Sequence, residues 1–281
     1  MNFANIATAF FFALVPALFW LTLYYHKDYK DPEPKKVIAK TFLIGALAAL
    51  PFLGFRYFLL WLNSGSAILT GISSVIIFAA MEEMAKLSAS IYVVTKHKVE
   101  FNQIIDGVVY AVTAALGFAF IENMIYFASF LSSGADTIDA LYVTAYRSFG
   151  TMLAHTLFSA TAGLIWAYAY FSKQITPFQQ KQLLAFEFRD FINHEILGLH
   201  IIRENILKAT PSRRGGHEKK VLVLEGIMLA IFLHVIFNLA TAFEIFGKNL
   251  TFLLVPLIIA GFLYISFLFT KKLNQKILKV V

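Results

Sequence analysis

Three glutamates of this 281-residue chain lie well inside stretches, far from their ends, that are otherwise apolar enough to cross a lipid bilayer. Glu82 and Glu83 are adjacent in the segment 67–95, and Glu122 lies in the segment 104–131. An ionised side chain at the centre of a membrane costs about 2.5–3.5 kcal/mol on insertion scales, so a chain retains one where it is paired, bound to a metal ion or used in chemistry. The three carboxylates therefore indicate a functional site inside the membrane.

Two histidines add to this set. His155 and His234 lie in two further apolar stretches, 140–171 and 221–246. Two imidazoles and one carboxylate form a common catalytic zinc site, in which an open position is left for water. A buried glutamate can also activate a water molecule directly, as a general base. The residue types fit both the metal-dependent and the metal-free version of hydrolysis.

Basic residues within the same stretches bear on the charge of the site. Lys86 is one turn from Glu82 and three residues from Glu83, so it can pair with one carboxylate and leave the other available. Arg147 offsets part of the remaining charge. With both histidines neutral, three glutamates and two basic residues leave one net negative charge, which a proton or a bound divalent cation would neutralise.

We expect the polar residues of these four stretches to converge on one cavity. In this interpretation Glu82 or Glu83 deprotonates a water molecule, and His234 and Asn238, which share a helix face, stabilise the developing oxyanion. The expected ligands of a zinc or other divalent ion are Glu122, His155 and His234. The residues expected to support the site are Lys86, Glu122, Asn123, Arg147 and His155.

The composition defines the class of protein that must position these residues. Hydrophobic residues make up 59% of the chain and charged residues only 15%, whereas about 25% is usual in soluble domains. Cysteine is absent, which excludes disulfides and a cysteine nucleophile. We expect an all-α membrane bundle of about seven transmembrane helices, with the polar site between the third and the sixth. The segments long enough to span are 4–24, 41–62, 67–95, 104–131, 140–171, 221–246 and 250–270.

Lysine and arginine predict the orientation of the bundle. On one side of the expected membrane the connecting segments hold only Lys248. Twenty of the 24 basic residues lie on the other side, in 25–40, 96–103, 172–220 and the tail after Thr270. The positive-inside rule then places the N-terminus outside and the C-terminus in the cytoplasm of a cell with this protein in its plasma membrane. The basic excess reflects this orientation and does not indicate nucleic-acid binding.

The segment 172–220 is the only sizeable stretch expected outside the membrane, as an insert in a single domain of residues 1–281. Residues 183–207 alternate apolar and charged positions at helical spacing, which is typical of an amphipathic helix on the inner leaflet. The stretch PSRRGGHEKK behind them is predicted to be a flexible basic loop. His194, Glu195 and His200 resemble a zinc motif, but histidines six residues apart on a helix point about 240° apart, so we expect a solvated polar face there.

The polar stretches, taken together, resemble a known family. EEMAK at 82–86, DGVVYAVTAALGFAFIENMIYF at 106–127, RSFGTMLAH at 147–155 and HVIFN at 234–238 are similar, in order and spacing, to the PrsW-type intramembrane proteases. DPEPKKVIAKTFLIGAL at 31–47 looks like the first cytoplasmic loop of that family. The family is related to the CAAX-processing (CPBP) prenyl endopeptidases, which share a membrane core with a Glu-Glu motif.

The resemblance implies functions for individual residues. Glu82 and Glu83 match the essential acidic pair, and Glu122 matches the FxxxE form of the second motif, where the CAAX-type relatives have histidine. His155 matches an additional histidine, and His234-Val235-Ile236-Phe237-Asn238 matches the HxxxN motif. The implied activity is hydrolysis of a peptide bond in a membrane-anchored protein, such as a single-span anti-sigma factor.

Functions of other classes also fit buried membrane carboxylates. A proton- or ion-coupled transporter uses such groups along its ion pathway, but this chain shows no two-fold internal repeat. A seven-helix retinal protein would need a Schiff-base lysine, which the last apolar stretch lacks. A non-catalytic scaffold on the same fold is a further alternative. Cleavage of a single-span peptide by the purified protein separates these alternatives from a protease.

Overall fold

The computed structural model describes residues 3–27, 31–63, 72–134, 137–172, 216–242, 244–245, 248–249 and 261. These residues form helices, apart from short connections and one two-stranded hairpin. The elements are α1 (Phe3–Lys27), α2 (Lys35–Asn63), α3 (Ile72–Lys96), α4 (Ile104–Ser132), α5 (Thr137–Tyr146), η1 (Arg147–Thr151), α6 (Met152–Phe171), α10 (Gly216–Ala242), β1 (Glu244–Ile245) and β2 (Lys248–Asn249).

The all-α membrane architecture expected from the sequence is confirmed. Within the described residues, five helical stretches are long and apolar enough to cross a bilayer: Phe3–His26, Lys35–Phe55, Ile104–Ser132, Asp139–Phe171 and Lys219–Thr241. The helix α3 is 25 residues long, but its centre carries three charged side chains. The seventh expected helix, 250–270, lies outside the described residues apart from Gly261, as does most of the insert 172–220.

Helix ends differ from the sequence prediction where basic residues flank an apolar stretch. Helix α2 begins at Lys35 and not at residue 41, so part of the expected basic loop is helical. Helix α10 begins at Gly216, so the residues GHEKK, which were predicted to belong to a flexible loop, form the first turns of this helix. Long basic side chains can leave a helix end and reach the aqueous interface, so the helix can continue past the apolar stretch. After α10, β1 pairs antiparallel with β2, with Glu244 opposite Asn249.

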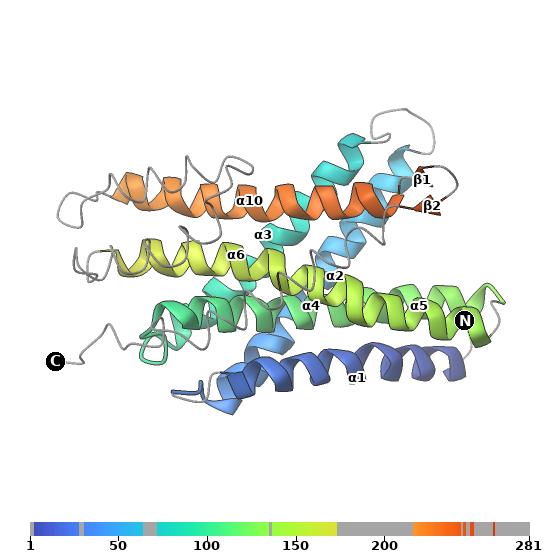
Figure 1. The fold of residues 1–281 in the computed structure, drawn as a ribbon, viewed down its shortest axis with the longest axis horizontal. Coiled ribbons are helices and arrows are strands. Elements are labelled where there is room, and N and C mark those ends of the chain that lie inside the picture. Colours follow the sequence, from blue (N-terminus) through green and yellow to red (C-terminus); the bar gives the residue numbers. More distant parts are fainter. Residues whose placement is uncertain are drawn as a thin grey trace.

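The helix α4 is the centre of the bundle. It packs against α1, α2 and α6, and α10 packs on the other side of α6 (Figure 1). Most α4 side chains from Ile104 to Phe120 are buried. Glycines permit the close approach of its neighbours, because a Cβ on Gly117 would lie 2.0 Å from the carbonyl oxygen of Phe42 on α2. A Cβ on Gly163 of α6 would lie 2.3 Å from the carbonyl oxygen of Gly107.

The fifth predicted span, 140–171, is interrupted. Helices α5 and α6 follow one another as one long rod in Figure 1, but the five residues of η1 between them form a π turn. Such turns occur frequently at functional sites. The turn lies eight residues or fewer before His155, so it belongs to the description of the site.

Candidate active site within the membrane bundle

The adjacent glutamates of α3 have different surroundings. Glu83 is buried and is surrounded by hydrogen-bond donors. Its Oε1 atom lies 2.8 Å from Lys86 Nζ and 2.8 Å from His234 Nδ1. Its Oε2 atom accepts a hydrogen bond of 3.3 Å from the hydroxyl of Ser159 on α6. These contacts fix the position of the Glu83 carboxylate.

Glu82 is also buried, but one of its oxygens is poorly satisfied. Its Oε2 atom lies 3.6 Å from Lys86 Nζ and 3.7 Å from His234 Nε2. Both distances are too long for a hydrogen bond, and this oxygen has no hydrogen-bond partner among the described residues. A buried carboxylate oxygen without such a partner is costly, so its presence needs an explanation.

His234 on α10 joins the two glutamates. Its ring stacks on Phe158 with centroids 5.1 Å apart and an interplanar angle of 25°. Because Nδ1 lies 2.8 Å from the Glu83 carboxylate, Nδ1 is the nitrogen that carries the proton in the neutral ring. The lone pair of Nε2 therefore faces Glu82. A carboxylate on one nitrogen and an available lone pair on the other is the usual arrangement of a metal-binding histidine.

His155 on α6 is held between two charged groups. Lys86 Nζ lies 2.6 Å from His155 Nδ1, and an ammonium group can only donate, so Nδ1 accepts. The proton of the neutral ring is then on Nε2, which lies 3.1 Å from Glu122 Oε2. Lys86 is fully buried, and its contacts with Glu83 and His155 connect α3 to α6.

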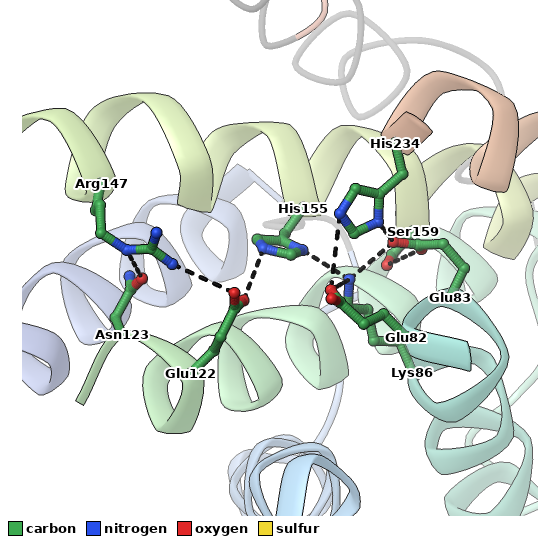
Figure 2. A network of polar contacts seen from close by, with 9 residues as sticks. All are labelled: Glu82, Glu83, Lys86, Glu122, Asn123, Arg147, His155, Ser159 and His234. Atoms are coloured by element: carbon green, nitrogen blue, oxygen red, sulfur yellow. Dashed lines mark hydrogen bonds and ion pairs between the residues drawn. The ribbon is translucent and has the colours of Figure 1, made fainter. Parts of the chain in front are cut away.

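The network continues outward from Glu122 to Arg147. Arg147 Nη2 lies 3.4 Å from Glu122 Oε1, and Arg147 Nε donates to Asn123 Oδ1 at 2.6 Å. The guanidinium group also lies over the ring of Tyr126, 4.3 Å from its centroid. One chain of polar contacts thus runs from Arg147 through Glu122 and His155 to the glutamates of α3 (Figure 2).

Eight of the nine residues predicted from the sequence belong to this network: Glu82, Glu83, Lys86, Glu122, Asn123, Arg147, His155 and His234. They come from α3, α4, η1, α6 and α10. Asn238 lies one turn beyond His234 on α10, half-buried and outside the network drawn in Figure 2. Its role at an oxyanion stays a prediction. The contact of Ser159 with Glu83 was not expected, although Ser159 lies four residues after His155 and therefore on the same helix face.

One group of residues has the geometry to hold a metal ion. In the part of the chain that the structure describes, Glu82, His155 and His234 each offer a ligand atom, and these atoms lie within 4.8 Å of one another. The ligand set predicted from the sequence contained Glu122 together with the two histidines, whereas the group in the structure contains Glu82. Glu122 lies on the Nε2 side of the His155 ring and is paired with Arg147, whereas Lys86 and Glu82 lie on the Nδ1 side.

The donor set and the charge of the network fit a divalent ion. The oxygen of Glu82 without a hydrogen bond and the lone pair of His234 Nε2 are 3.7 Å apart. The three glutamates carry one more charge than Lys86 and Arg147 together, so a cation is compatible with the site. The other zinc-like set considered in the sequence, His194, Glu195 and His200, lies outside the described residues.

Comparison with known proteins gives one consistent result. A family described as "PrsW family intramembrane metalloprotease" matches residues 33–187, which is more than half of the chain. A protein named Protease PrsW from Oceanobacillus iheyensis is 29% identical over 231 residues, covering 82% of this chain and 94% of that protein. Proteins of the same name from Geobacillus kaustophilus and Clostridioides difficile are 29% and 33% identical over 65% and 63% of their own lengths, and 57% and 55% of this chain. No solved structure matches the chain.

Proposed function

Because the chain belongs to the PrsW family of intramembrane metalloproteases, we propose that it hydrolyses a peptide bond of a membrane-anchored protein at the buried cluster of Glu82, Glu83 and His234. The observation that carries the proposal is the carboxylate oxygen of Glu82, which is buried, makes no hydrogen bond within the described residues and faces the lone pair of His234 Nε2. An oxygen in these surroundings is suited to accept a proton from a water molecule.

The two glutamates act differently in the proposed reaction. Glu82 is the general base: it takes a proton from the attacking water, whose oxygen forms the new bond to the scissile carbonyl carbon, and it returns this proton to the leaving amine. Glu83 orients the site, because it accepts hydrogen bonds from Lys86, His234 and Ser159. Its bond to Nδ1 keeps the lone pair of His234 directed toward the reacting water.

In the metal-dependent form of the reaction, a divalent ion in this cluster would be held by Glu82, His155 and His234, and Glu82 would then be a ligand of the ion and not the base. We propose zinc, since two imidazoles and one carboxylate with an open position are a catalytic zinc set. When bound, the ion supplies Lewis-acid polarisation of the scissile carbonyl and of water. Lys86 Nζ lies 2.6 Å from His155 Nδ1, so the ammonium group would have to leave this lone pair before the ring could bind the ion.

The substrate class and the topology extend the proposal. The cluster lies between apolar helices, which supports a substrate that is itself anchored in the bilayer. We propose a single-span protein, such as an anti-sigma factor, cleaved in the plasma membrane by one domain whose N-terminus is outside and whose C-terminus is cytoplasmic. The location of the basic residues in the sequence supports this orientation.

The direct test uses detergent-purified protein and a fluorescent single-span peptide. Glu82→Gln keeps the size and polarity of the side chain but removes the base, so we expect cleavage to fall by about 10²–10⁴-fold with the protein still folded. Glu225→Gln is the matched control, because it changes a glutamate of α10 that lies outside the network of Figure 2. Full cleavage by a Glu82→Gln, Glu83→Gln double variant would overturn the proposed function.

A further inference from the structure

The π turn η1 changes the register of the long helix that carries Arg147 and His155. The N–H group of Met152 bonds to the carbonyl of Arg147, five residues earlier, where an α-helix would use the residue four earlier. A π turn therefore accommodates one residue more than an α turn. The residues on the two sides of η1 are rotated relative to each other by that extra residue.

This rotation places two residues of the site on the same face. Residues eight apart on an unbroken α-helix differ by about 80° in direction, and one extra residue takes up about 100°, which leaves about 20°. Arg147 and His155 accordingly both reach Glu122. Arg147 Nη2 lies 3.4 Å from Oε1, and His155 Nε2 lies 3.1 Å from Oε2. Without the π turn, the directions of the two side chains would differ by about 80° and not by about 20°.

A side chain of α1 contacts the turn. In a regular helix the N–H group of Met152 would bond to the carbonyl of Ser148, but here it bonds to Arg147. The indole Nε1 of Trp20 donates to this Ser148 carbonyl at 2.8 Å. Trp20 is buried, and its ring meets that of Phe149 edge to face, with centroids 5.8 Å apart. Trp20 thus satisfies a carbonyl that the π turn releases from its helical partner.

A second side chain of α1 contacts the same long helix beyond His155. The hydroxyl groups of Tyr24 and Thr156 are 3.0 Å apart. Because the Thr156 hydroxyl donates to the carbonyl of Leu153 at 2.7 Å, Tyr24 is the donor in this pair. Trp20 and Tyr24 are one turn apart, so one face of α1 holds the long helix before and after His155.

We propose that Trp20 is a positioning residue, which holds the π turn in place and so keeps Arg147 and His155 aligned on Glu122. Trp20 acts through the backbone of Ser148 and touches neither glutamate of the cluster in the contacts described above. Its expected effect on cleavage rests on the proposed function. Its effect on helix register does not, and the two can be measured separately.

The register is measured by spin labelling, for which a chain without cysteine is well suited. Single cysteines at 139–146 and at 153–160 carry nitroxides, and oxygen accessibility in lipid vesicles gives the direction of each helix half. Trp20→Phe keeps an aromatic ring but removes the N–H donor. We expect it to shift the accessibility phase of 139–146 relative to 153–160 by about 100°, the angle of one residue.

Deletion of one residue supplies the rescue. Gly150 has no side chain, and the nearest atoms to a Cβ there are those of the Tyr146 ring, 3.4 Å away. Deleting Gly150 removes the extra residue, so a regular α-helix then has the register that the π turn provides in the complete chain. We expect this deletion to restore the phase in the Trp20→Phe background. Tyr24→Phe is the matched control. It removes the hydrogen bond between Tyr24 and Thr156, which lies beyond the turn, so the Gly150 deletion should not correct the effect of this variant.

Cleavage of a single-span peptide is the second measurement. A misplaced catalytic group can cost about 10²-fold in rate, so Trp20→Phe should lower kcat by up to about that factor with a smaller effect on KM. The Gly150 deletion should recover most of the activity lost in Trp20→Phe. It should not recover activity lost in Tyr24→Phe. An unchanged phase in Trp20→Phe overturns the proposal even if the deletion variant fails to fold. If Trp20→Phe shifts the phase but the wild-type protein cleaves no peptide, the role of Trp20 in helix register is supported and the proposed function is rejected.

Discussion

At the scale of single residues, two adjacent glutamates have different surroundings. Consecutive residues on a helix point about 100° apart, so Glu82 and Glu83 face different neighbours. Glu83 receives donors from α3, α6 and α10, whereas Glu82 Oε2 has no hydrogen bond among the described residues. In the proposed reaction, this asymmetry assigns the orienting role to Glu83 and the role of the base to Glu82.

Glu83→Gln is therefore expected to act on His234. An amide oxygen in the place of Oε1 carries no negative charge, so it holds the Nδ1 proton of His234 less strongly than the carboxylate does. Mutation of such a partner of a metal-binding histidine typically lowers metal affinity by about 10–100-fold. Isothermal titration calorimetry of the purified protein with Zn²⁺ measures this affinity. Ser159→Ala is the control, since it removes only the 3.3 Å contact and should change the affinity less. Equal affinity of Glu83→Gln and wild type would contradict the orienting role.

Lys86→Met tests the internal cation. Lys86 is fully buried beside Glu82, Glu83 and His155, and its Nζ also lies 4.9 Å from the ring of Phe118. Removing one partner of a buried ion pair costs about 3–5 kcal/mol, because the other charge is left uncompensated. We expect a lower thermal unfolding temperature, and a larger rise on adding Zn²⁺ than in wild type, since the metal replaces the lost charge. A variant that Zn²⁺ does not stabilise would count against a metal site at this cluster.

The residue types of the site and the pairing of Lys86 with one adjacent glutamate could be predicted from the sequence, but the partners of Glu122 and of the two histidines could not. A carboxylate in a membrane stretch is costly wherever it lies, so Glu82, Glu83 and Glu122 could be identified from composition alone. Which carboxylate approaches the two histidines depends on how α3, α4 and α6 pack together. That packing puts Glu82 in the potential metal group and pairs Glu122 with Arg147.

At the scale of the elements, the helices were predictable and the π turn was not. Apolar length predicted the five spans found among the described residues, because a helix must cross about 30 Å of hydrocarbon. The stretch RSFGT of η1 contains no proline or other residue that requires a change of hydrogen-bonding pattern. Its register depends on a donor from α1, more than a hundred residues earlier. Such a tertiary contact is not visible in a local sequence pattern.

Close helix packing gives a prediction at this scale. A Cβ on Gly117 would lie 2.0 Å from the Phe42 carbonyl oxygen, so Gly117→Ala forces α2 and α4 apart. Overpacking of this kind typically costs about 1–3 kcal/mol, and we expect a corresponding loss of stability in thermal unfolding of the detergent-purified protein. Gly54→Ala is the matched control on α2, where a Cβ meets no atom within 4 Å. Equal stability of the two variants would show that α2 does not pack on α4 in this way.

At the scale of the whole molecule, the polar network is enclosed by a bundle with an apolar outer surface. Large hydrophobic side chains such as Phe11, Leu43 and Tyr142 are exposed, as expected where helices contact lipid. Glu82, Glu83, Lys86 and His234 are nearly inaccessible inside. A buried polar cluster in an apolar shell is compatible with chemistry on a substrate that shares the bilayer.

The orientation of this bundle is the remaining prediction of the whole molecule, and cysteine labelling can test it. Helix α4 has 29 residues, so it is about 44 Å long and exceeds the hydrocarbon core. Lys98 lies in the exposed turn before α4, and Ser133 lies directly after it, so the two residues mark opposite sides of the membrane. Because the 96–103 connection is basic, we expect a cysteine at Ser133 to react with a membrane-impermeant maleimide on intact cells, and one at Lys98 to react only after lysis. The wild-type chain, which has no cysteine, gives the background. The reverse labelling would invert the topology, and labelling of both positions on intact cells would show that α4 does not span the membrane.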